Sequence, residues 1–426
     1  MNNKTQVSHP PSGIWRYRLI LWIAAIPIIG YTLWQAVRHR QLRYLQQRLG
    51  FNYPPPTQAV IWLHAASVGE VLAAEPLINA LHDRYPKNSI VVSTITPTGA
   101  QMVRDRLANR VRHVYLPIDW CYAVRRFLDN CRPCCALIME TELWPNLYRA
   151  IGRDALPLVI VNARVSSKTL NTRGWVRHLY RSTLQNVTMV LAKSQTDADG
   201  FLELGAASEK VHVVGNIKFS AAKPVTDIQP VALPHPFVLA ASTHDDEELQ
   251  LARMWLALST GDTLLVIAPR HPNRSASIIK QLRSLSIHFA VRSRNEPIQT
   301  DTRVYLADTL GELTGFMASA ELVVMGGSFV PVGGHNILEP AMLGKAILFG
   351  PDMHNFSEEA DGLLDHRAAI QVNDYQQLGE QLLSLLQDDA KRRTLEDRAR
   401  KFMQSSSDVL EHYLSAIKTH CQLAAE

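Results

Sequence analysis

The sequence predicts an α/β fold of two doubly wound, Rossmann-like domains that face each other across a cleft, preceded by an N-terminal membrane-anchor helix. Short apolar runs such as AVIWLH, SIVVST and CALIME alternate with helical patterns from residue 59 onward, which is typical of a parallel sheet covered by helices on both faces. The alternation stops at a proline-rich stretch and resumes with FVLAAS, TLLVIAP and ELVVMGGS. A length of 426 residues is also enough for two domains, each with its own core.

The domain boundaries follow from the same pattern. The stretch KPVTDIQPVALPHPF has no periodicity and contains four prolines, which indicates a linker. We therefore expect the following segments: an anchor with a basic flank over 1–48, a first domain over 49–222, the linker over 223–236, and a second domain with a C-terminal helical tail over 237–426.

The N-terminal segment differs from the rest of the chain in its hydrophobicity. From Leu19 to Val37 it contains no charged residue and is just long enough to cross a bilayer, which takes about 17–25 helical residues. More basic residues follow the segment than precede it, and no signal-peptide cleavage site is present. We expect a single anchor with the bulk of the chain in the cytoplasm. A helix lying in the membrane plane is the alternative, because the segment is short and contains Pro27.

Composition narrows the classes of partner. The formal net charge of +5 is small and dispersed, so we do not expect nucleic acid, whereas a mildly basic surface suits anionic lipid or an acidic substrate. The five cysteines are odd in number and follow no secretory signal, which favours a reducing compartment.

The sequence offers no convincing metal site. The CRPC motif has the CxxC spacing, but no second pair and no suitably spaced histidine accompany it. Asp197 and Asp199 match the metal-binding DxD pattern. However, Ser194 indicates the start of a helix, on which residues two apart point to opposite sides. The acidic run 245–248 is expected to be solvated at a helix start, where it complements the helix dipole.

Three candidate residues of the first domain lie where strands are expected to end. Glu70 follows AVIWLH, and SVGE there fits a capping box in which Ser67 and Glu70 satisfy each other's backbone N–H groups. A carboxylate in a first helical turn after a loop of small residues is also where an α/β enzyme places a catalytic base, so both interpretations stay open. Glu140 directly follows the apolar run CALIM and should project from a strand end. Lys218 follows VHVVGNI, and a plain surface lysine is the alternative there.

Three loops of the second domain together indicate a nucleotide site. ELVVM runs into GGSFVPVGGHNILEP, whose glycines let backbone approach a ligand and whose helix near Asn336 would offer N–H groups to a phosphate. Glu339 is then placed to accept hydrogen bonds from ribose hydroxyls. Arg270 in APRHPNR suits bidentate phosphate contacts, and DTLGEL supplies the third loop. The spacing is not GxGxxG, so a dinucleotide is not indicated.

The motifs WLHAASVGE, METELWPN, NARVSSKT, GNIKF, APRHPNR, DTLGEL and GGSFVPVGGHNILEP occur in this order behind the apolar segment. In this combination the chain resembles, over essentially its whole length, the 3-deoxy-D-manno-octulosonic acid (Kdo) transferases of lipopolysaccharide synthesis. The resemblance implies a GT-B fold at the inner leaflet of the Gram-negative inner membrane. It also implies an inverting single displacement, without metal or other cofactor, that moves Kdo from CMP-Kdo to the lipid A precursor lipid IVA.

The resemblance also assigns roles to residues. The family's catalytic base falls on Glu70, and its transition-state stabilising positions fall on Glu140 and Lys218. Its CMP contacts fall on the following residues: Pro269, Arg270, Leu310, Gly311, Glu312, Asn336, Ile337, Leu338 and Glu339.

Two other functions fit parts of the pattern. A membrane-associated GT-B transferase that uses a UDP-sugar would show the same alternation of strands and helices and the same Gly-rich loop. A non-catalytic nucleotide- or lipid-binding protein would not need Glu70, Glu140 and Lys218 to face one cleft. A sugar-nucleotide epimerase of this architecture would need no lipid acceptor, so the apolar N-terminal segment argues against it.

Overall fold

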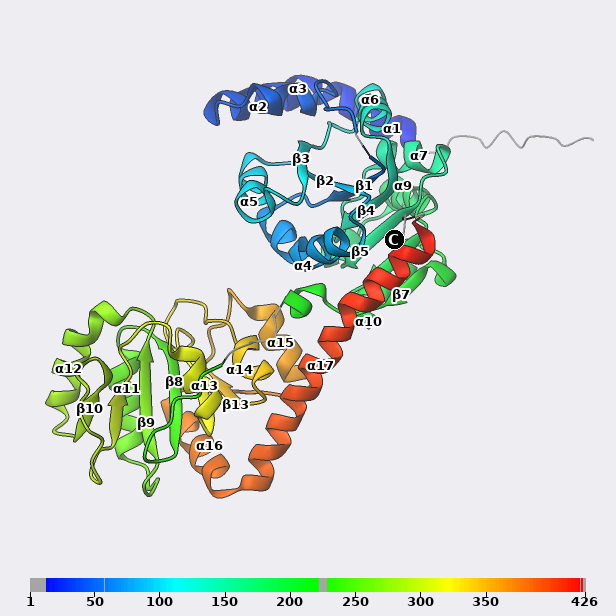
Figure 1. The fold of residues 1–426 in the computed structure, drawn as a ribbon. Coiled ribbons are helices and arrows are strands. Elements are labelled where there is room, and N and C mark those ends of the chain that lie inside the picture. Colours follow the sequence, from blue (N-terminus) through cyan, green and yellow to red (C-terminus); the bar gives the residue numbers. More distant parts are fainter. Residues whose placement is uncertain (1–12, 57, 222–227, 422, 424–426) are drawn as a thin grey trace, which may run out of the picture. The chain divides into compact units, whose positions relative to one another are not determined.

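The computed structural model describes residues 13–56, 58–221, 228–421 and 423, and the chain divides into two compact units (Figure 1). Unit 1 comprises Met1–Ala221 and Ser406–Glu426, and unit 2 comprises Ala222–Ser405. Each unit contains one seven-stranded sheet in which every pair of neighbouring strands is parallel. The predicted α/β class and the two Rossmann-like sheets are therefore confirmed.

The N-terminal segment folds into helices that cover part of unit 1. These are α1 (Ile14–Ile23), α2 (Ala25–Arg38) and α3 (Leu42–Arg48). The expected continuous helix is broken at Ala24, and α1 and α2 meet at an angle of 58°. Within the described ranges, no single helix is long and apolar enough to cross a membrane, and only this bent pair meets the criterion jointly.

Unit 1 follows the predicted alternation of strands and helices. Its elements after α3 are β1 (Val60–His64), α4 (Val68–Arg84), β2 (Ser89–Thr94), α5 (Pro97–Leu107), β3 (Arg112–Tyr115), α6 (Cys121–Cys131), β4 (Pro133–Met139), α7 (Pro145–Arg153), β5 (Leu158–Ala163), α8 (Ser167–Leu170), α9 (Gly174–Leu184), β6 (Met189–Ala192), α10 (Gln195–Leu204), the 3-10 turn η1 (Ser208–Lys210), β7 (Val211–Val213) and the 3-10 turn η2 (Ile217–Ala221). The strand order is β3-β2-β1-β4-β5-β6-β7. The direction of winding thus reverses between β1 and β4, and ligands of such sheets bind outside the carboxyl ends of strands at this switch point.

Unit 2 repeats the arrangement. Its elements are β8 (Phe237–Thr243), α11 (Glu247–Leu256), β9 (Leu264–Pro269), η3 (Pro272–Arg274), α12 (Ser275–Ser284), β10 (Phe289–Val291), η4 (Arg292–Arg294), β11 (Val304–Leu306), α13 (Leu313–Ser319), β12 (Leu322–Met325), α14 (Leu338–Met342), β13 (Ala346–Phe349), α15 (Ser357–Asp365), β14 (Ile370–Gln371) and α16 (Tyr375–Gln387). The strand order β10-β11-β9-β8-β12-β13-β14 puts the switch point between β8 and β12. Of the predicted linker, residues 223–227 lie outside the described residues, and 228–236 form no helix or strand before β8.

The C-terminal helix α17 (Asp389–His420) corrects the predicted domain boundary. The tail was expected to belong to the second domain, but its last turns belong to unit 1. Val409, Tyr413, Leu414 and Ile417 are buried in the same hydrophobic core as β1 and α4. Burial of this apolar stripe keeps the end of the chain on unit 1.

Candidate active site

Glu70 lies in the first turn of α4, directly after the carboxyl end of β1. Ser67 caps the helix, because its hydroxyl accepts a hydrogen bond from the N–H of Glu70 (3.3 Å). The same hydroxyl donates to Oε1 of Glu70 (2.9 Å), and the N–H of Ala66 donates to Oε2 (2.8 Å). The Glu70 carboxylate thus folds back onto the loop, bonding the N–H of Ala66 rather than that of Ser67 expected in a capping box.

The Glu70 side chain is 8% exposed, and its titration reflects this burial. Burial raises its pKa from the ordinary 4.5 to about 7. The hydrogen bonds from Ala66 and Ser67 oppose the rise, whereas the charges of Glu142 and Glu140 add to it. A carboxylate with a pKa near neutrality can accept a proton at physiological pH, as a general base must.

Glu140 occupies the matching position after β4, the strand that pairs with β1 at the switch point. Its backbone φ is +55°, in the left-handed region that few residues other than glycine adopt. Its N–H nevertheless continues the ladder to the carbonyl of Val161 (3.0 Å), and its carboxylate lies 3.7 Å from Arg164. Backbone strain of this kind concentrates at functional sites. Glu70 and Glu140 thus follow the ends of two paired strands, and the charge of Glu140 contributes to the raised pKa of Glu70.

Lys218 lies on η2, which packs against α4, the helix that carries Glu70. Its backbone N–H donates to Oδ1 of Asn216 (3.1 Å). The preceding loop is held from the C-terminal helix, because the Tyr413 hydroxyl donates to the carbonyl of Gly215 (3.0 Å) and accepts from the N–H of Asn162 (3.2 Å). Sequence reasoning missed Tyr413, since nothing local in α17 signals a contact with residues about 200 positions earlier.

A pocket in unit 2 gathers four of the nine predicted nucleotide contacts. This solvent-open pocket has a volume of about 180 Å³ and lies at the carboxyl ends of the strands, and Pro269, Arg270, Leu310 and Gly311 line it. Gly311 has a φ of +86°, which lets the DTLGEL loop turn sharply there. Leu310 is 83% exposed, so an apolar side chain is available to a ligand.

Glu312 lines a neighbouring, more polar pocket together with Arg292. The two side chains form an ion pair of 2.6 Å, and hydrogen bonding to Arg292 lowers the pKa of Glu312. The side chain of Glu312 is therefore committed to Arg292 and the hydroxyl of Thr309.

The loop that carries Asn336, Ile337, Leu338 and Glu339 is not part of the Arg270 pocket lining. The predicted helix there is short, α14, and its first N–H, on Leu338, already bonds Oδ1 of Asn336 (3.1 Å). Burial raises the pKa of Glu339.

Three histidines extend this edge of unit 2 and were missed by sequence reasoning. His244 follows β8 and His335 follows the Gly-rich loop, and their Nε2 atoms lie 2.8 Å apart. Burial, His244 and then Arg270 lower the pKa of His335 to about 4, so Arg270 lies close to the pair. His271 stacks edge-on against His244. His271 and His335 lie inside motifs that were already recognised, and His244 directly follows β8; these positions are the signals that could have found them.

The acidic run 245–248 is only partly solvated, which corrects the expectation. Glu247 and Glu248 are fully buried. Glu247 accepts hydrogen bonds from the N–H groups of His244 (2.8 Å) and Gly327 (2.7 Å), and thereby ties the Gly-rich loop to the start of α11. Glu248 pairs with Arg274 (2.8 Å).

Asp197 and Asp199 of the DxD pattern lie in the first half of α10. Ser194 caps α10 by accepting from the N–H of Asp197 (3.1 Å), and the Gln195 amide donates to Oδ1 of Asp199 (2.8 Å). Among the residues that the structure describes, no group of three or more His, Cys, Asp or Glu side chains is arranged to hold a metal ion.

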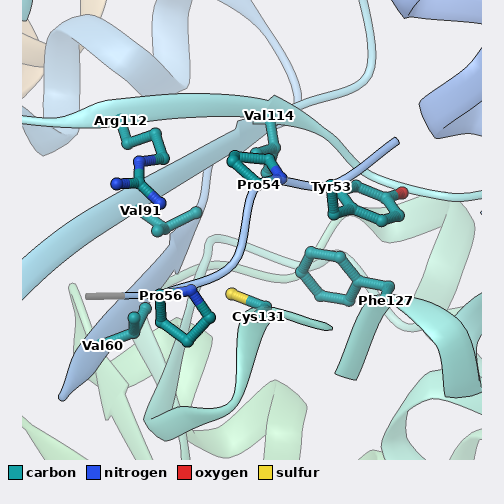
Figure 2. Close-up of a pocket in the computed structure, with 9 residues that line it drawn as sticks. All are labelled: Tyr53, Pro54, Pro56, Val60, Val91, Arg112, Val114, Phe127 and Cys131. Carbon is teal, nitrogen blue, oxygen red and sulfur yellow. The ribbon is translucent and has the colours of Figure 1, made fainter. Parts of the chain in front are cut away.

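A cavity in unit 1 is small and apolar (Figure 2). It has room for about one water molecule, and Val60 and Arg112, which begin β1 and β3, are among its lining residues. Burial raises the pKa of the Cys131 thiol there to about 12, which makes it a poor nucleophile. This cavity lies apart from the carboxyl-end residues described above.

Comparison with known proteins shows which family the chain belongs to. A family model described as 3-deoxy-D-manno-octulosonic-acid transferase (kdotransferase) matches residues 43–221. The 3-deoxy-D-manno-octulosonic acid transferase of Haemophilus influenzae is 31% identical over 408 residues, covering 92% of this chain and 95% of that protein. The chain belongs to the Kdo transferase family. The Kdo transferase of Bordetella pertussis is 32% identical and covers 87% of this chain and 90% of its own length.

Solved structures agree on the fold of this Kdo transferase. A UDP-GlcNAc 2-epimerase from Neisseria meningitidis matches with a TM-score of 0.51 at 15% identity, covering 84% of this chain and 100% of that chain. A glycosyltransferase from Rickettsia africae matches with a TM-score of 0.50 at 13% identity, covering 87% and 100%. The expected GT-B fold and glycosyltransferase class are confirmed, and the non-catalytic alternative is set aside.

Proposed function

We propose that this Kdo transferase moves Kdo from CMP-Kdo to a hydroxyl of lipid IVA, by an inverting single displacement that uses Glu70 as the general base. The observation that carries the proposal is the buried Glu70 carboxylate, with its pKa near 7, beside Glu140 at the switch point of unit 1. The proposal also rests on the family to which the chain belongs.

Glu70 would act on the acceptor. In a single displacement, the lipid hydroxyl attacks the anomeric carbon of Kdo as the bond to the CMP phosphate breaks. The carboxylate takes the hydroxyl proton, for which it must be deprotonated and within hydrogen-bond reach. The bonds to Ala66 and Ser67 keep the carboxylate oriented, and loss of either bond would favour the protonated, inactive form.

Glu140 and Lys218 would act on the charges that develop. The sugar becomes cation-like as the leaving group departs, and Glu140, held in a strained backbone conformation, is suited to stabilise it. The Lys218 ammonium is suited to the carboxylate of Kdo and to the departing phosphate. Fixed charges of this kind lower the barrier because they need no reorganisation during the reaction.

Unit 2 would hold the CMP group. Arg270 offers a planar guanidinium to the phosphate, and Pro269, Leu310 and Gly311 line the same pocket. The backbone of Glu312 and the segment Asn336–Glu339 would complete the contacts, with Glu339 toward the ribose. No metal or other cofactor has a role in this scheme. The reaction would take place at the cytoplasmic face of the bacterial inner membrane, where the N-terminal helices anchor the protein.

A donor assay tests the proposal. Purified protein is incubated with lipid IVA and either CMP-Kdo or a set of UDP-sugars, with and without EDTA. The lipid products are identified by mass spectrometry. We expect product only with CMP-Kdo as the donor, namely lipid that carries Kdo, and the same rate of formation with EDTA as without it. Transfer from a UDP-sugar would support the alternative donor class, and loss of activity with EDTA would refute metal independence.

A further inference from the structure

The outer face of α1 and α2 is apolar and exposed to an extent that is unusual for a folded domain. Ile26 is 84% exposed, Val37 76%, Ile23 73% and Trp22 70%. Contiguous apolar surface of this kind on a soluble unit marks a binding site.

The opposite face of the pair is fastened to unit 1. Leu21, Ala25 and Ile28 pack against the buried side chains of Ile118 and Trp120. Ile118 and Trp120 directly precede α6, and Figure 1 shows α1 beside α6 and α7. The pair is thus a fixed layer of the domain, with one apolar face covered and the other bare.

Polar side chains lock α1 in the same place. The Tyr17 hydroxyl donates to Oδ2 of Asp119 (2.9 Å), and Nε of Arg18 donates to Oδ1 of Asn146 (2.8 Å). Asp119 is buried and also accepts the N–H groups of Asn146 (2.9 Å) and Leu147 (2.8 Å) at the start of α7. A helix that spans the membrane would have to leave unit 1. This would break the hydrogen bonds of Tyr17 and Arg18 and expose Ile118 to water.

Neither helix alone is long enough to cross a membrane. With 10 and 14 residues, α1 and α2 are about 15 and 21 Å long at 1.5 Å per residue, and the hydrocarbon core is about 30 Å thick. Only the two helices together, bent by 58°, are long enough for a span, so the contacts that hold α1 on unit 1, and not the length, argue against one.

The charges and aromatic side chains around the apolar face fit a lipid headgroup layer. Residues 13–48 contain six arginines and no acidic residue. Arg16 and Arg38 are exposed at the outer ends of the pair, each stacked on a neighbouring tryptophan, Trp15 and Trp34. Arginine attracts anionic lipid, and tryptophan prefers the membrane interface.

We infer that α1 and α2 form a docking surface that enters only the cytoplasmic leaflet of an anionic bilayer and does not cross it. This inference rests on the proposed membrane location and defines its geometry. Asp119 follows the carboxyl end of β3, and Asn146 lies in the first turn of α7 after β4, so the surface is fastened to the sheet edge that carries Glu70 and Glu140. A lipid acceptor could then present its sugar head to that edge while its acyl chains stay in the leaflet.

The first experiment asks which side of the membrane holds the N-terminus. The full chain carries a peptide tag ahead of Met1 and is expressed in bacteria, and protease is added to spheroplasts or to inside-out vesicles. We expect the tag to be cleaved only in inside-out vesicles. Cleavage in spheroplasts would mean that the helix pair spans the membrane and would overturn the inference, while the proposed membrane location would survive.

The second experiment asks whether the exposed face binds lipid. Flotation with phosphatidylglycerol-containing vesicles compares the full chain with a Trp22→Asp/Ile26→Asp variant and with Leu202→Asp, an exposed leucine on α10 as the control. We expect at least a tenfold loss of flotation for the double variant and none for the control, with circular dichroism spectra unchanged. Equal flotation of both variants would overturn the docking surface, as would conversion of a dimer to a monomer with flotation intact. Failure of the unaltered chain to float would instead refute the membrane location itself.

Discussion

Replacing Glu70 with glutamine separates catalysis from helix capping, because it removes the charge and keeps the shape of the side chain. If Glu70 is the general base, kcat for Kdo transfer should fall about 10²- to 10⁴-fold. In the unaltered enzyme, kcat/KM should rise with pH and level off above about pH 7, where the carboxylate is ionised. The residual activity of Glu70→Gln should lack this rise.

The change in the free energy of unfolding of Glu70→Gln has opposite signs if the ionised Glu70 is a buried, costly charge and if it only supports the helix cap. Burial raises the pKa of Glu70 from 4.5 to about 7, so the folded chain holds a proton that the unfolded chain has lost between these values. The free energy of unfolding therefore falls as pH rises from 4.5, and the loss is complete above about pH 7. At about 1.4 kcal/mol per pKa unit, this loss is about 3 kcal/mol. Glu70→Gln should consequently melt higher than the unaltered enzyme at pH 8, and this difference should vanish near pH 4.5. If the carboxylate only supports the cap, Glu70→Gln should instead lower the free energy of unfolding by about 0.5–2 kcal/mol.

Ser67→Ala is the matched control for the cap. It removes the hydroxyl that bonds Oε1 of Glu70 and caps α4, so unfolding should become easier by about 1 kcal/mol. Because this hydrogen bond lowers the pKa of Glu70, the midpoint of the pH–rate profile should move upward while the activity at pH 9 is kept. Stopped or quenched assays of Kdo-lipid formation across pH 5–9, with thermal melts of each protein, provide all of these quantities. A folded Glu70→Gln enzyme with undiminished kcat and an unchanged pH profile would refute the base assignment.

Three further variants test the supporting structure. Arg270→Ala should weaken CMP binding at least tenfold by calorimetry, with Arg253→Ala on the exposed face of α11 unchanged; equal affinities would remove Arg270 from the donor site. Tyr413→Phe takes a donor from the carbonyl of Gly215 and should destabilise unit 1 by about 1–3 kcal/mol in urea titrations, while kcat falls more than KM rises; an unchanged kcat would separate α17 from the Lys218 loop. Glu247→Ala leaves buried N–H groups unpaired and should lower both the melting temperature and CMP affinity, and tight CMP binding by the variant would contradict the support role.

The sequence predicted best what depends on short-range pattern. Alternating apolar runs and helical periodicity defined both sheets, and the Ser67 and Ser194 caps appeared where the pattern placed them. The positions of Glu70 and Glu140 could also be predicted, because both directly follow strands and parallel strands present their carboxyl ends at one edge.

Contacts between distant parts of the chain could not be read in this way. The end of α17 packs on unit 1 because of an apolar stripe whose partner is not encoded locally, and Tyr413 reaches a loop about 200 residues away. The acidic run after β8 is similar. Glu247 looks like a solvated first-turn residue until the folded Gly-rich loop supplies the N–H groups that it binds. Likewise, the packing of α1 and α2 on unit 1 could not be read from the hydropathy of the segment, although Pro27, which lacks an N–H in the first turn of α2, fits the break at Ala24.

The most direct test of the central proposal is the identity of the product formed by the purified enzyme from CMP-Kdo and lipid IVA. Mass spectrometry of the lipid, with NMR of the new glycosidic bond, reports both the group transferred and its anomeric configuration. We predict lipid IVA that carries Kdo in the configuration opposite to that of the donor. Retention of configuration, or the absence of Kdo from the lipid, would contradict the account of Glu70 as the base of an inverting Kdo transfer.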